Sequence, residues 1–146
     1  MLREKPFDFP AECFIRVIAD TDCYCEADDQ YCVAHMLMTP RFEMAGLVAE
    51  QFGTQNGDDS EQKSYDELQN IVHLMGLDGE VGIYHGAHHA LSDVRTPVES
   101  EGARLIVREA MKDDTRPLFV CCQGALTNMA SAYLMEHAIA DRVTVI

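Results

Sequence analysis

The sequence predicts an α/β fold in which a parallel β-sheet is covered by helices on both faces. Three observations support this prediction. Short apolar runs alternate with segments of helical spacing from residue 14 to residue 146, after a loose lead-in at residues 1–12. The apolar runs are continuous, as in strands that are buried on both sides. Parallel strands are joined by right-handed crossovers, which place the connecting helices over the sheet.

The first strand is expected at residues 14–19, and a helix follows it from Asp28 to about Met38. Thr39-Pro40 ends this helix, because the residue before a proline is disfavoured in helical conformation. The second strand is expected at residues 43–49. A polar loop at residues 51–63 is rich in Gly, Asn and Asp, and loops of this length often carry function.

The next helix is expected to begin at Ser64, where Glu67 completes a capping box, and to end at Gly76. A short third strand follows at residues 81–84. Thr96 is the expected N-cap of a third helix, with Pro97 in its first position.

The fourth strand is expected at residues 118–121, and a sharp turn at 123–128 leads into a helix that ends near His137. A fifth strand is expected at 142–146. The chain shows no internal repeat and no linker, so one domain is expected to span residues 1–146.

The composition narrows the classes of function. The 146 residues include 25 Asp and Glu but only 11 Lys and Arg, which gives a formal net charge of −14. Such an acidic chain is unsuited to nucleic acid or to an anionic membrane surface, since both attract basic patches. The sequence has no apolar run of transmembrane length and no signal-peptide stretch, so a cytoplasmic location is expected.

An acidic cluster follows the first strand and opens the first helix, and it consists of Asp20, Asp22, Asp28 and Asp29. Open α/β sheets bind their ligands at the carboxyl ends of strands. Four neighbouring carboxylates repel one another, and a hard cation such as Ca²⁺ or Mg²⁺ would relieve that repulsion. The spacing does not fit an EF-hand loop. The alternative is that these residues only cap the helix and complement its dipole.

Cysteine and histidine residues suggest a second kind of site. Cys23, Cys25, Cys121 and Cys122 fall at predicted strand ends, where a soft-metal or redox site is conceivable. Their spacing matches no strong zinc signature, so buried, inert thiols are the preferred interpretation. The histidines of the segment 85–89 have no carboxylate or Cys at useful spacing, and a structural role is expected for them.

Two motifs at strand ends resemble those of the inosine-uridine-preferring nucleoside hydrolases, or N-ribohydrolases. They are Asp20-Thr21-Asp22 with Asp28-Asp29, and Gly124-Ala125-Leu126-Thr127-Asn128. Residues 96–106 also resemble a subgroup of that family. The resemblance implies a Rossmann-like α/β fold, one bound Ca²⁺, and hydrolysis of the N-glycosidic bond of a ribonucleoside or related riboside, as in purine and pyrimidine salvage.

The resemblance also implies a role for each matching residue. Asp22 would bind Ca²⁺ and act as the general base for the attacking water. Asp29 would bind Ca²⁺ through both carboxylate oxygens, and Thr127 would offer the ion its backbone carbonyl. The bound Ca²⁺ would lower the pKa of the water and so assist its attack on the anomeric carbon.

The remaining matching residues would hold the sugar and support the ligands. Asp28 would bind a ribose hydroxyl, while Asp20 and Asn128 would orient the ligands from behind. The ribose-contacting Asn that follows the second strand in the family is not evident here. Glu50, Gln51 and Gly53 fall near that place, and the role stays unassigned.

The chain is shorter than the family, and it corresponds to the amino-terminal half. The later half of the family supplies further contacts to ribose, the leaving base and Ca²⁺. The chain is therefore expected to be a fragment, a truncated product or one half of an assembly, and an exposed last strand would favour a homo-oligomer. Two other functions stay open: a non-catalytic remnant that binds metal or nucleoside, and a thiol-based metal or redox protein.

Overall fold

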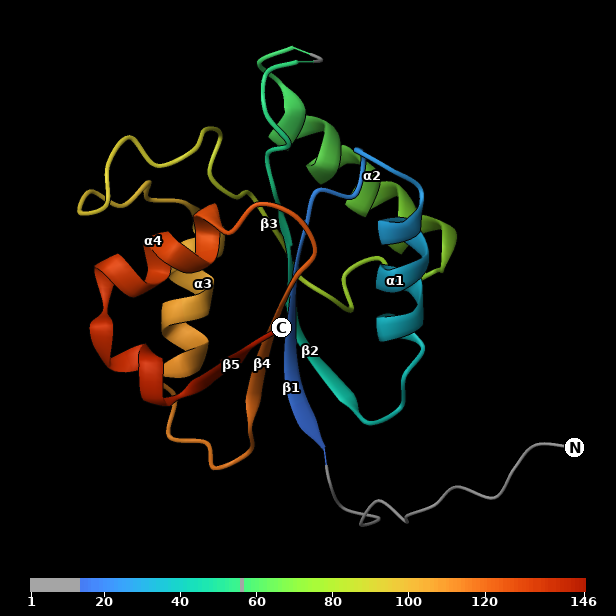
Figure 1. Cartoon of the computed structure of the whole chain (residues 1–146). Helices are drawn as coiled ribbons and strands as arrows, with labels where there is room; N and C mark the ends of the chain where they lie inside the picture. Colours follow the sequence, from blue (N-terminus) through green and yellow to red (C-terminus); the bar gives the residue numbers. More distant parts are fainter. Residues whose placement is uncertain (1–13, 56) are drawn as a thin grey trace, which may run out of the picture.

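The computed structural model describes residues 14–55 and 57–146, in which five strands form one parallel sheet (Figure 1). The predicted lead-in at residues 1–12 lies outside the described residues. The strands are β1 (Ile15–Thr21), β2 (Phe42–Ala49), β3 (Ile83–Tyr84), β4 (Leu118–Cys122) and β5 (Val143–Val145). Their order in the sheet is β3-β2-β1-β4-β5, and each neighbouring pair is parallel. The predicted parallel α/β sheet is confirmed.

Helices cover both faces of this sheet, as the sequence predicts. They are α1 (Asp28–Leu37), α2 (Ser60–Leu74), α3 (Glu101–Ala110) and α4 (Thr127–Met135), followed by a short 3₁₀ helix (His137–Asp141). Figure 1 shows α1 and α2 on one side of the strands and α3 and α4 on the other.

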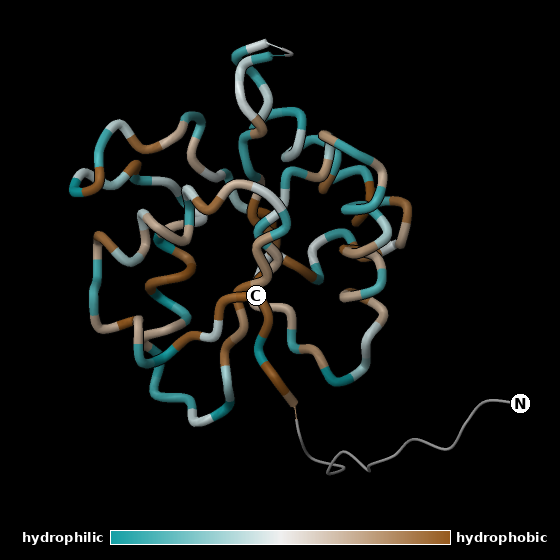
Figure 2. The backbone as a smooth tube through the Cα atoms, in the orientation of Figure 1, coloured by the Kyte–Doolittle hydropathy of each residue, from teal (hydrophilic) through white to brown (hydrophobic). Residues whose placement is uncertain are grey.

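The hydrophobic core has two parts, one on each face of the sheet. Val17 and Ala19 of β1 pack with α1 and α2, whereas Ile18 packs with α3 and α4. This alternation follows from the strand geometry, because successive side chains point to opposite faces. Both faces are covered, which explains why β1 is a continuous apolar run in the sequence. Figure 2 shows the hydrophobic colour concentrated on the central strands.

Strand β1 lies at the centre of the sheet and is bound to both neighbours up to its last residues. The Glu50 amide donates to the Thr21 carbonyl (2.8 Å), and the Gln123 amide donates to the Asp20 carbonyl (2.8 Å). From β1 the chain proceeds outward to β2 and β3 on one side, and it then crosses back to add β4 and β5 on the other side of β1. The carboxyl end of β1 is therefore the switch point of the sheet, where folds of this kind bind their ligands.

The predicted start of α2 at Ser64 is wrong, because the helix begins at Ser60. Ser64 is buried within the helix, and its hydroxyl donates to the Ser60 carbonyl (3.3 Å). Ser60 and Glu61 are also buried and face polar partners. A buried helix face made of polar residues has no apolar signature, so the sequence suggested a loop there.

The predicted start of α3 at Thr96 is also wrong. Ser100 is the N-cap, and its hydroxyl accepts a hydrogen bond from the Ala103 amide (3.0 Å). The Thr96 amide instead donates to the Asp93 carboxylate (2.9 Å), in a turn that precedes the helix. The capping site therefore lies four residues later than Thr96. Smaller differences are a β3 of two residues and an α4 that ends at Met135.

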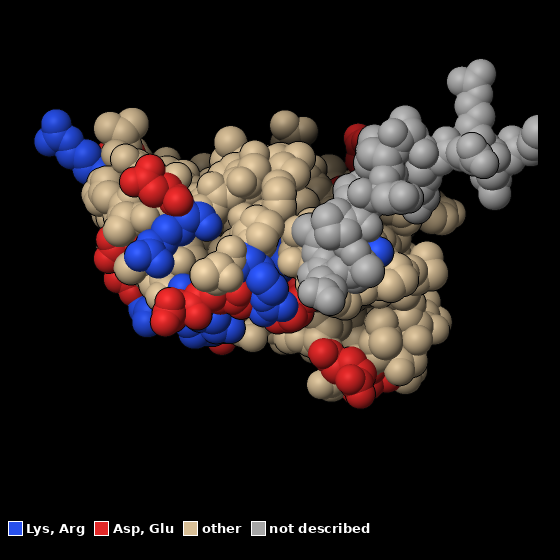
Figure 3. Space-filling model, turned by 90° about the horizontal axis from the view of Figure 1, so that it is seen from below, with Lys and Arg blue, Asp and Glu red and all other residues tan. Residues whose placement is uncertain are grey.

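The opposite end of the sheet is held by ion pairs. Arg16 of β1 is 4 % exposed and donates to the carbonyls of Glu109 (2.8 Å) and Arg116 (3.1 Å). Arg116 in turn pairs with Asp114 and Glu43. Figure 3, which views the molecule from this end, shows acidic and basic side chains intermingled. Among the described residues, no helix is long and apolar enough to cross a membrane.

Candidate functional site

The acidic residues predicted from the sequence gather at the carboxyl end of β1. Asp20 is fully buried within the strand, and the Asn128 side-chain amide donates to its Oδ1 (2.8 Å). Asp22 follows the strand and is half-buried. Its backbone carbonyl accepts from the Cys25 amide (2.7 Å), which turns the chain toward α1.

Asp29 lies against Asp22, although seven positions separate them in the sequence. Asp29 is 8 % exposed in the first turn of α1. Its pKa is raised to about 6, first by burial and then by the charge of Asp22 and the hydrogen-bond contact with the Asp22 carboxyl group. Asp28 is exposed beside it. The structure therefore brings Asp20, Asp22 and Asp29 together and leaves Asp28 open to a ligand.

Glu50 adds another carboxylate to this group. Its role is not evident from the sequence. It is the first residue after β2 and is fully buried. Burial and the neighbouring charge of Asp20 raise the pKa of the Glu50 carboxyl well above its usual range. Burial likewise raises the pKa of Asp20, which lies in hydrogen-bond contact with Glu50. The signal in the sequence that could have identified Glu50 as a site residue is its position as a charged residue directly after an apolar strand.

Several buried carboxylate oxygens of this group accept no hydrogen bond from an N–H or hydroxyl group in the described structure. They are Asp20 Oδ2 and both carboxylate oxygens of Glu50, and the two carboxyl groups contact each other. Buried polar atoms are nearly always paired, so such a concentration needs an explanation. Oxygen-only donors that carry negative charge suit Ca²⁺, which takes six to eight oxygen ligands.

The donor chemistry thus fits a calcium ion, but the side chains do not form a completed cage. Within residues 14–55 and 57–146, no group of three or more His, Cys, Asp or Glu side chains is already arranged to hold a metal. Binding of an ion would require the carboxylates to turn toward it.

Thr127 and Asn128 open α4 beside this group. Thr127 is the first helical residue, and its hydroxyl lies 3.5 Å from the side-chain amide of Gln51. The Asn128 side-chain oxygen accepts from the Ala87 amide (2.8 Å) and the Ser100 hydroxyl (3.0 Å). Asn128 therefore connects Asp20 to the loop after β3 and to the start of α3.

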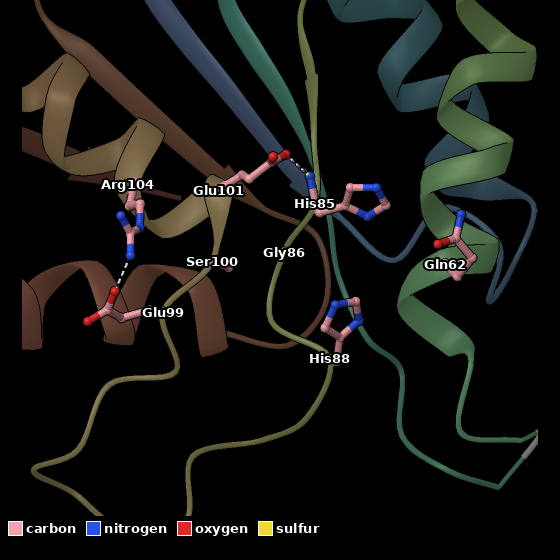
Figure 4. Close-up of a pocket in the computed structure, with 8 residues that line it drawn as sticks. All are labelled: Gln62, His85, Gly86, His88, Glu99, Ser100, Glu101 and Arg104. Carbon is pink, nitrogen blue, oxygen red and sulfur yellow. Dashed lines mark hydrogen bonds and ion pairs between the residues drawn. The ribbon is translucent and has the colours of Figure 1, made fainter.

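A pocket of about 490 Å³ lies near the carboxyl end of β3, between α2 and α3 (Figure 4). The buried Glu61 carboxylate contacts Nδ1 of both His85 (3.0 Å) and His88 (3.0 Å) on its wall. The His85 ring stacks on Tyr65 at 3.7 Å between centroids. The expectation that no carboxylate accompanies these histidines was wrong, because Glu61 comes from a helix turn that was predicted to be loop.

Among the described residues, Cys23, Cys25, Cys121 and Cys122 do not all lie together: Cys25 is exposed, and Cys23 packs with the α1–α2 side of the core. Cys121 packs with the α1–α2 side of the core and Cys122 with the opposite side. Burial raises the pKa of Cys23 and of Cys122 to about 12, so both remain neutral thiols near pH 7. This arrangement favours the interpretation of these cysteines as inert.

Comparisons with known proteins show what the fold is similar to. No protein-family model and no curated protein matches the sequence. A nucleoside hydrolase-related hypothetical protein from Saccharophagus degradans, associated with carbohydrate metabolism, matches with a TM-score of 0.62 and 21 % identity. The match covers 90 % of this chain and 38 % of that protein.

An inosine-guanosine nucleoside hydrolase matches with a TM-score of 0.62 and 18 % identity, over 88 % of this chain and 45 % of that chain. The protein thus spans less than half the length of either structure. At these identities the likeness shows the fold: the sheet and its helices are arranged as in part of a nucleoside hydrolase.

Proposed function

We propose that this chain, which has the fold of part of a nucleoside hydrolase, takes part in Ca²⁺-dependent hydrolysis of the N-glycosidic bond of ribonucleosides or related ribosides. The observation that carries the proposal is the set of buried carboxylates at the switch point of the sheet, some of whose oxygens accept no hydrogen bond from an N–H or hydroxyl group in the described structure. A cation there would offset the repulsion among Asp20, Asp22, Asp29 and Glu50.

In this proposal, Asp22, Asp29 and the carbonyl of Thr127 hold the ion. When bound, Ca²⁺ supplies a fixed positive charge that lowers the pKa of a water molecule. Asp22 accepts the proton of that water, and its half-buried position supports this role because it is open both to solvent and to Asp29. Asp20 and Asn128 restrict the movement of the ligands from behind.

Asp28 binds the sugar. Its carboxylate is exposed at the start of α1, next to Asp29, and it is free to accept hydrogen bonds from ribose hydroxyls. As the bond between the anomeric carbon and the base breaks, its electron pair leaves with the base and positive charge develops on the sugar. The neighbouring carboxylates stabilise that charge.

The test is the hydrolysis of 4-nitrophenyl riboside by the purified protein, with Ca²⁺ and with EDTA. We expect release of nitrophenol that EDTA abolishes. Asp22→Asn should lower the rate by about 100-fold or more, because the proton acceptor is lost. Asp58→Asn is the matched control, since Asp58 is exposed and lies outside the acidic group.

Three other outcomes have distinct meanings. Ca²⁺ binding without release would support the non-catalytic binding function instead. Release that is insensitive to EDTA and to Asp22→Asn would contradict the proposed mechanism. If the protein neither releases nitrophenol nor binds Ca²⁺, both functions are contradicted.

A further inference from the structure

We propose that Glu50 is an additional ligand of the cation, so that its carboxylate joins those of Asp22 and Asp29 around the ion. This inference rests on the proposed function, because it concerns the same site. The family resemblance assigns an Asn that contacts ribose to the segment after β2, so the role of Glu50 is not transferred from it.

The burial of Glu50 is the first argument. The side chain is fully buried, and its carboxylate oxygens accept no hydrogen bond from an N–H or hydroxyl group in the described structure; their contact is with the Asp20 carboxyl group. Its backbone is fixed by the hydrogen bond from its amide to the Thr21 carbonyl (2.8 Å). A buried carboxylate without a donor is costly to ionise, so a proton or a cation must neutralise it.

The position of the carboxylate is the second argument. A Cβ atom built on Gly124 would lie 2.6 Å from Glu50 Oε2, 2.6 Å from Asp22 Cγ and 2.7 Å from Asp22 Oδ1. The carboxylates of Glu50 and Asp22 therefore converge on one small space, which stays open because residue 124 is a glycine. Asp22 also contacts Asp29, so Glu50 faces the predicted ligands directly.

The ligand count is the third argument. Ca²⁺ takes about six to eight oxygen atoms, and the carboxylates of Asp22 and Asp29 with the Thr127 carbonyl supply fewer, so water or further side chains must complete the shell. A further carboxylate at the end of the neighbouring strand would add both oxygen atoms and charge. Among the described residues, Glu50 is the fully buried carboxylate at this place that has no N–H or hydroxyl donor on either oxygen.

The competing explanation is a proton shared between Glu50 and Asp20, whose carboxyl groups are in contact. Such a pair needs no ion. The two explanations predict opposite results when Glu50 is replaced by its neutral isostere. Glutamine would preserve a hydrogen bond to Asp20 but would remove a charged ligand from the ion.

The experiment measures cation binding directly, by titration calorimetry with Ca²⁺ and by sensitised Tb³⁺ luminescence. We expect Glu50→Gln to weaken the affinity by about 10- to 100-fold. Glu26→Gln is the matched control, because Glu26 lies near the site but is exposed. This variant should bind the cation as tightly as the wild type. Circular dichroism shows whether each variant is folded.

A second variant keeps the test decisive if Glu50→Gln does not fold. Gly124→Ala places a methyl group in the space shared by Glu50 and Asp22, so it should weaken binding while both carboxylates remain present. If the folded Glu50 variant binds as tightly as the wild type, Glu50 is not a ligand, and the proposed function survives. If Gly124→Ala binds as tightly as the wild type, neither Glu50 nor Asp22 binds the ion through this space, and the proposed ligand set fails as well. If the wild-type protein binds neither Ca²⁺ nor Tb³⁺, the proposed function itself fails.

Discussion

Asn128 connects distant segments of the chain through the polar atoms of one side chain. It donates to Asp20, 108 residues earlier, and accepts from Ala87 and Ser100. The sequence motif indicated that Asn128 belongs near the acidic cluster. Its partners in the loop after β3 and at the start of α3 had no signal, because they depend on how the crossovers bring these segments together.

Replacement of Asn128 by alanine should destabilise the protein by about 2–4 kcal/mol, because the buried Ala87 amide and Asp20 would lose their partner. Urea denaturation measures the change. Asn70→Ala is the control: Asn70 is exposed on α2, where its amide contacts Glu67, and the change should be within about 0.5 kcal/mol. A loss below about 1 kcal/mol for Asn128→Ala would show that water can replace its hydrogen bonds.

Two buried glutamates illustrate what sequence reasoning missed at the residue scale. Glu50 and Glu61 are both fully or almost fully buried and belong to polar clusters. Acidic residues are usually exposed, so a single sequence gives no reason to place them in the interior. By contrast, Asp20, Asp22 and Asp29 could be predicted as a group, because several carboxylates follow one apolar strand.

At the scale of elements, strands were predicted better than helix starts. The apolar runs of β1, β2 and β4 are buried on both faces, so their hydrophobicity alone identified them. Helix starts depend on which polar side chain reaches a free amide. Ser100 and Thr96 are both acceptable caps by residue type, and tertiary contact with Asn128 selects Ser100.

This selection can be tested with a pair of alanine substitutions. Ser100→Ala should cost about 1–2 kcal/mol, because it removes the hydrogen bond to the Ala103 amide at the start of α3. Thr96→Ala should change the stability by less than about 0.5 kcal/mol, since Thr96 is exposed before the helix. Thermal or urea unfolding compares the two. Equal effects would mean that the helix is not capped as described.

At the scale of the whole molecule, the buried carboxylates should make stability depend on pH and on Ca²⁺. The pKa of Asp20 is raised to about 7 and that of Asp29 to about 6, both above their usual range near 4. Between the usual pKa near 4 and these raised values, the folded state binds more protons than the unfolded state. The free energy of unfolding should therefore fall as pH rises from about 5 to about 7.5.

We expect a loss of several kcal/mol over this range in EDTA, to which the raised pKa of Glu50 also contributes, and a much smaller loss in saturating Ca²⁺. Carboxyls with lowered pKa values, such as Asp114 and Glu43, titrate below this window and do not oppose the trend. Urea denaturation at pH 5 and pH 7.5 measures this change in the free energy of unfolding. Identical pH profiles with and without Ca²⁺ would contradict a cation site at these residues.

Strands β3 and β5 form the two edges of the sheet within the described residues. The prediction of a homo-oligomer that pairs through β5 stays a prediction.

The central position of β1 has a consequence for the motions of the site. Amide hydrogens of β1 are bonded to two neighbouring strands, so they should exchange with deuterium only when the whole domain unfolds. In the exposed turn after Asp22, the amides of Tyr24, Glu26 and Ala27 should exchange within seconds. Asp20 would then sit on the slowest-exchanging strand, while Asp28 follows one of the fastest-exchanging segments. The site would combine a rigid part, the end of β1, with a mobile part at the start of α1 that can adjust to a ligand.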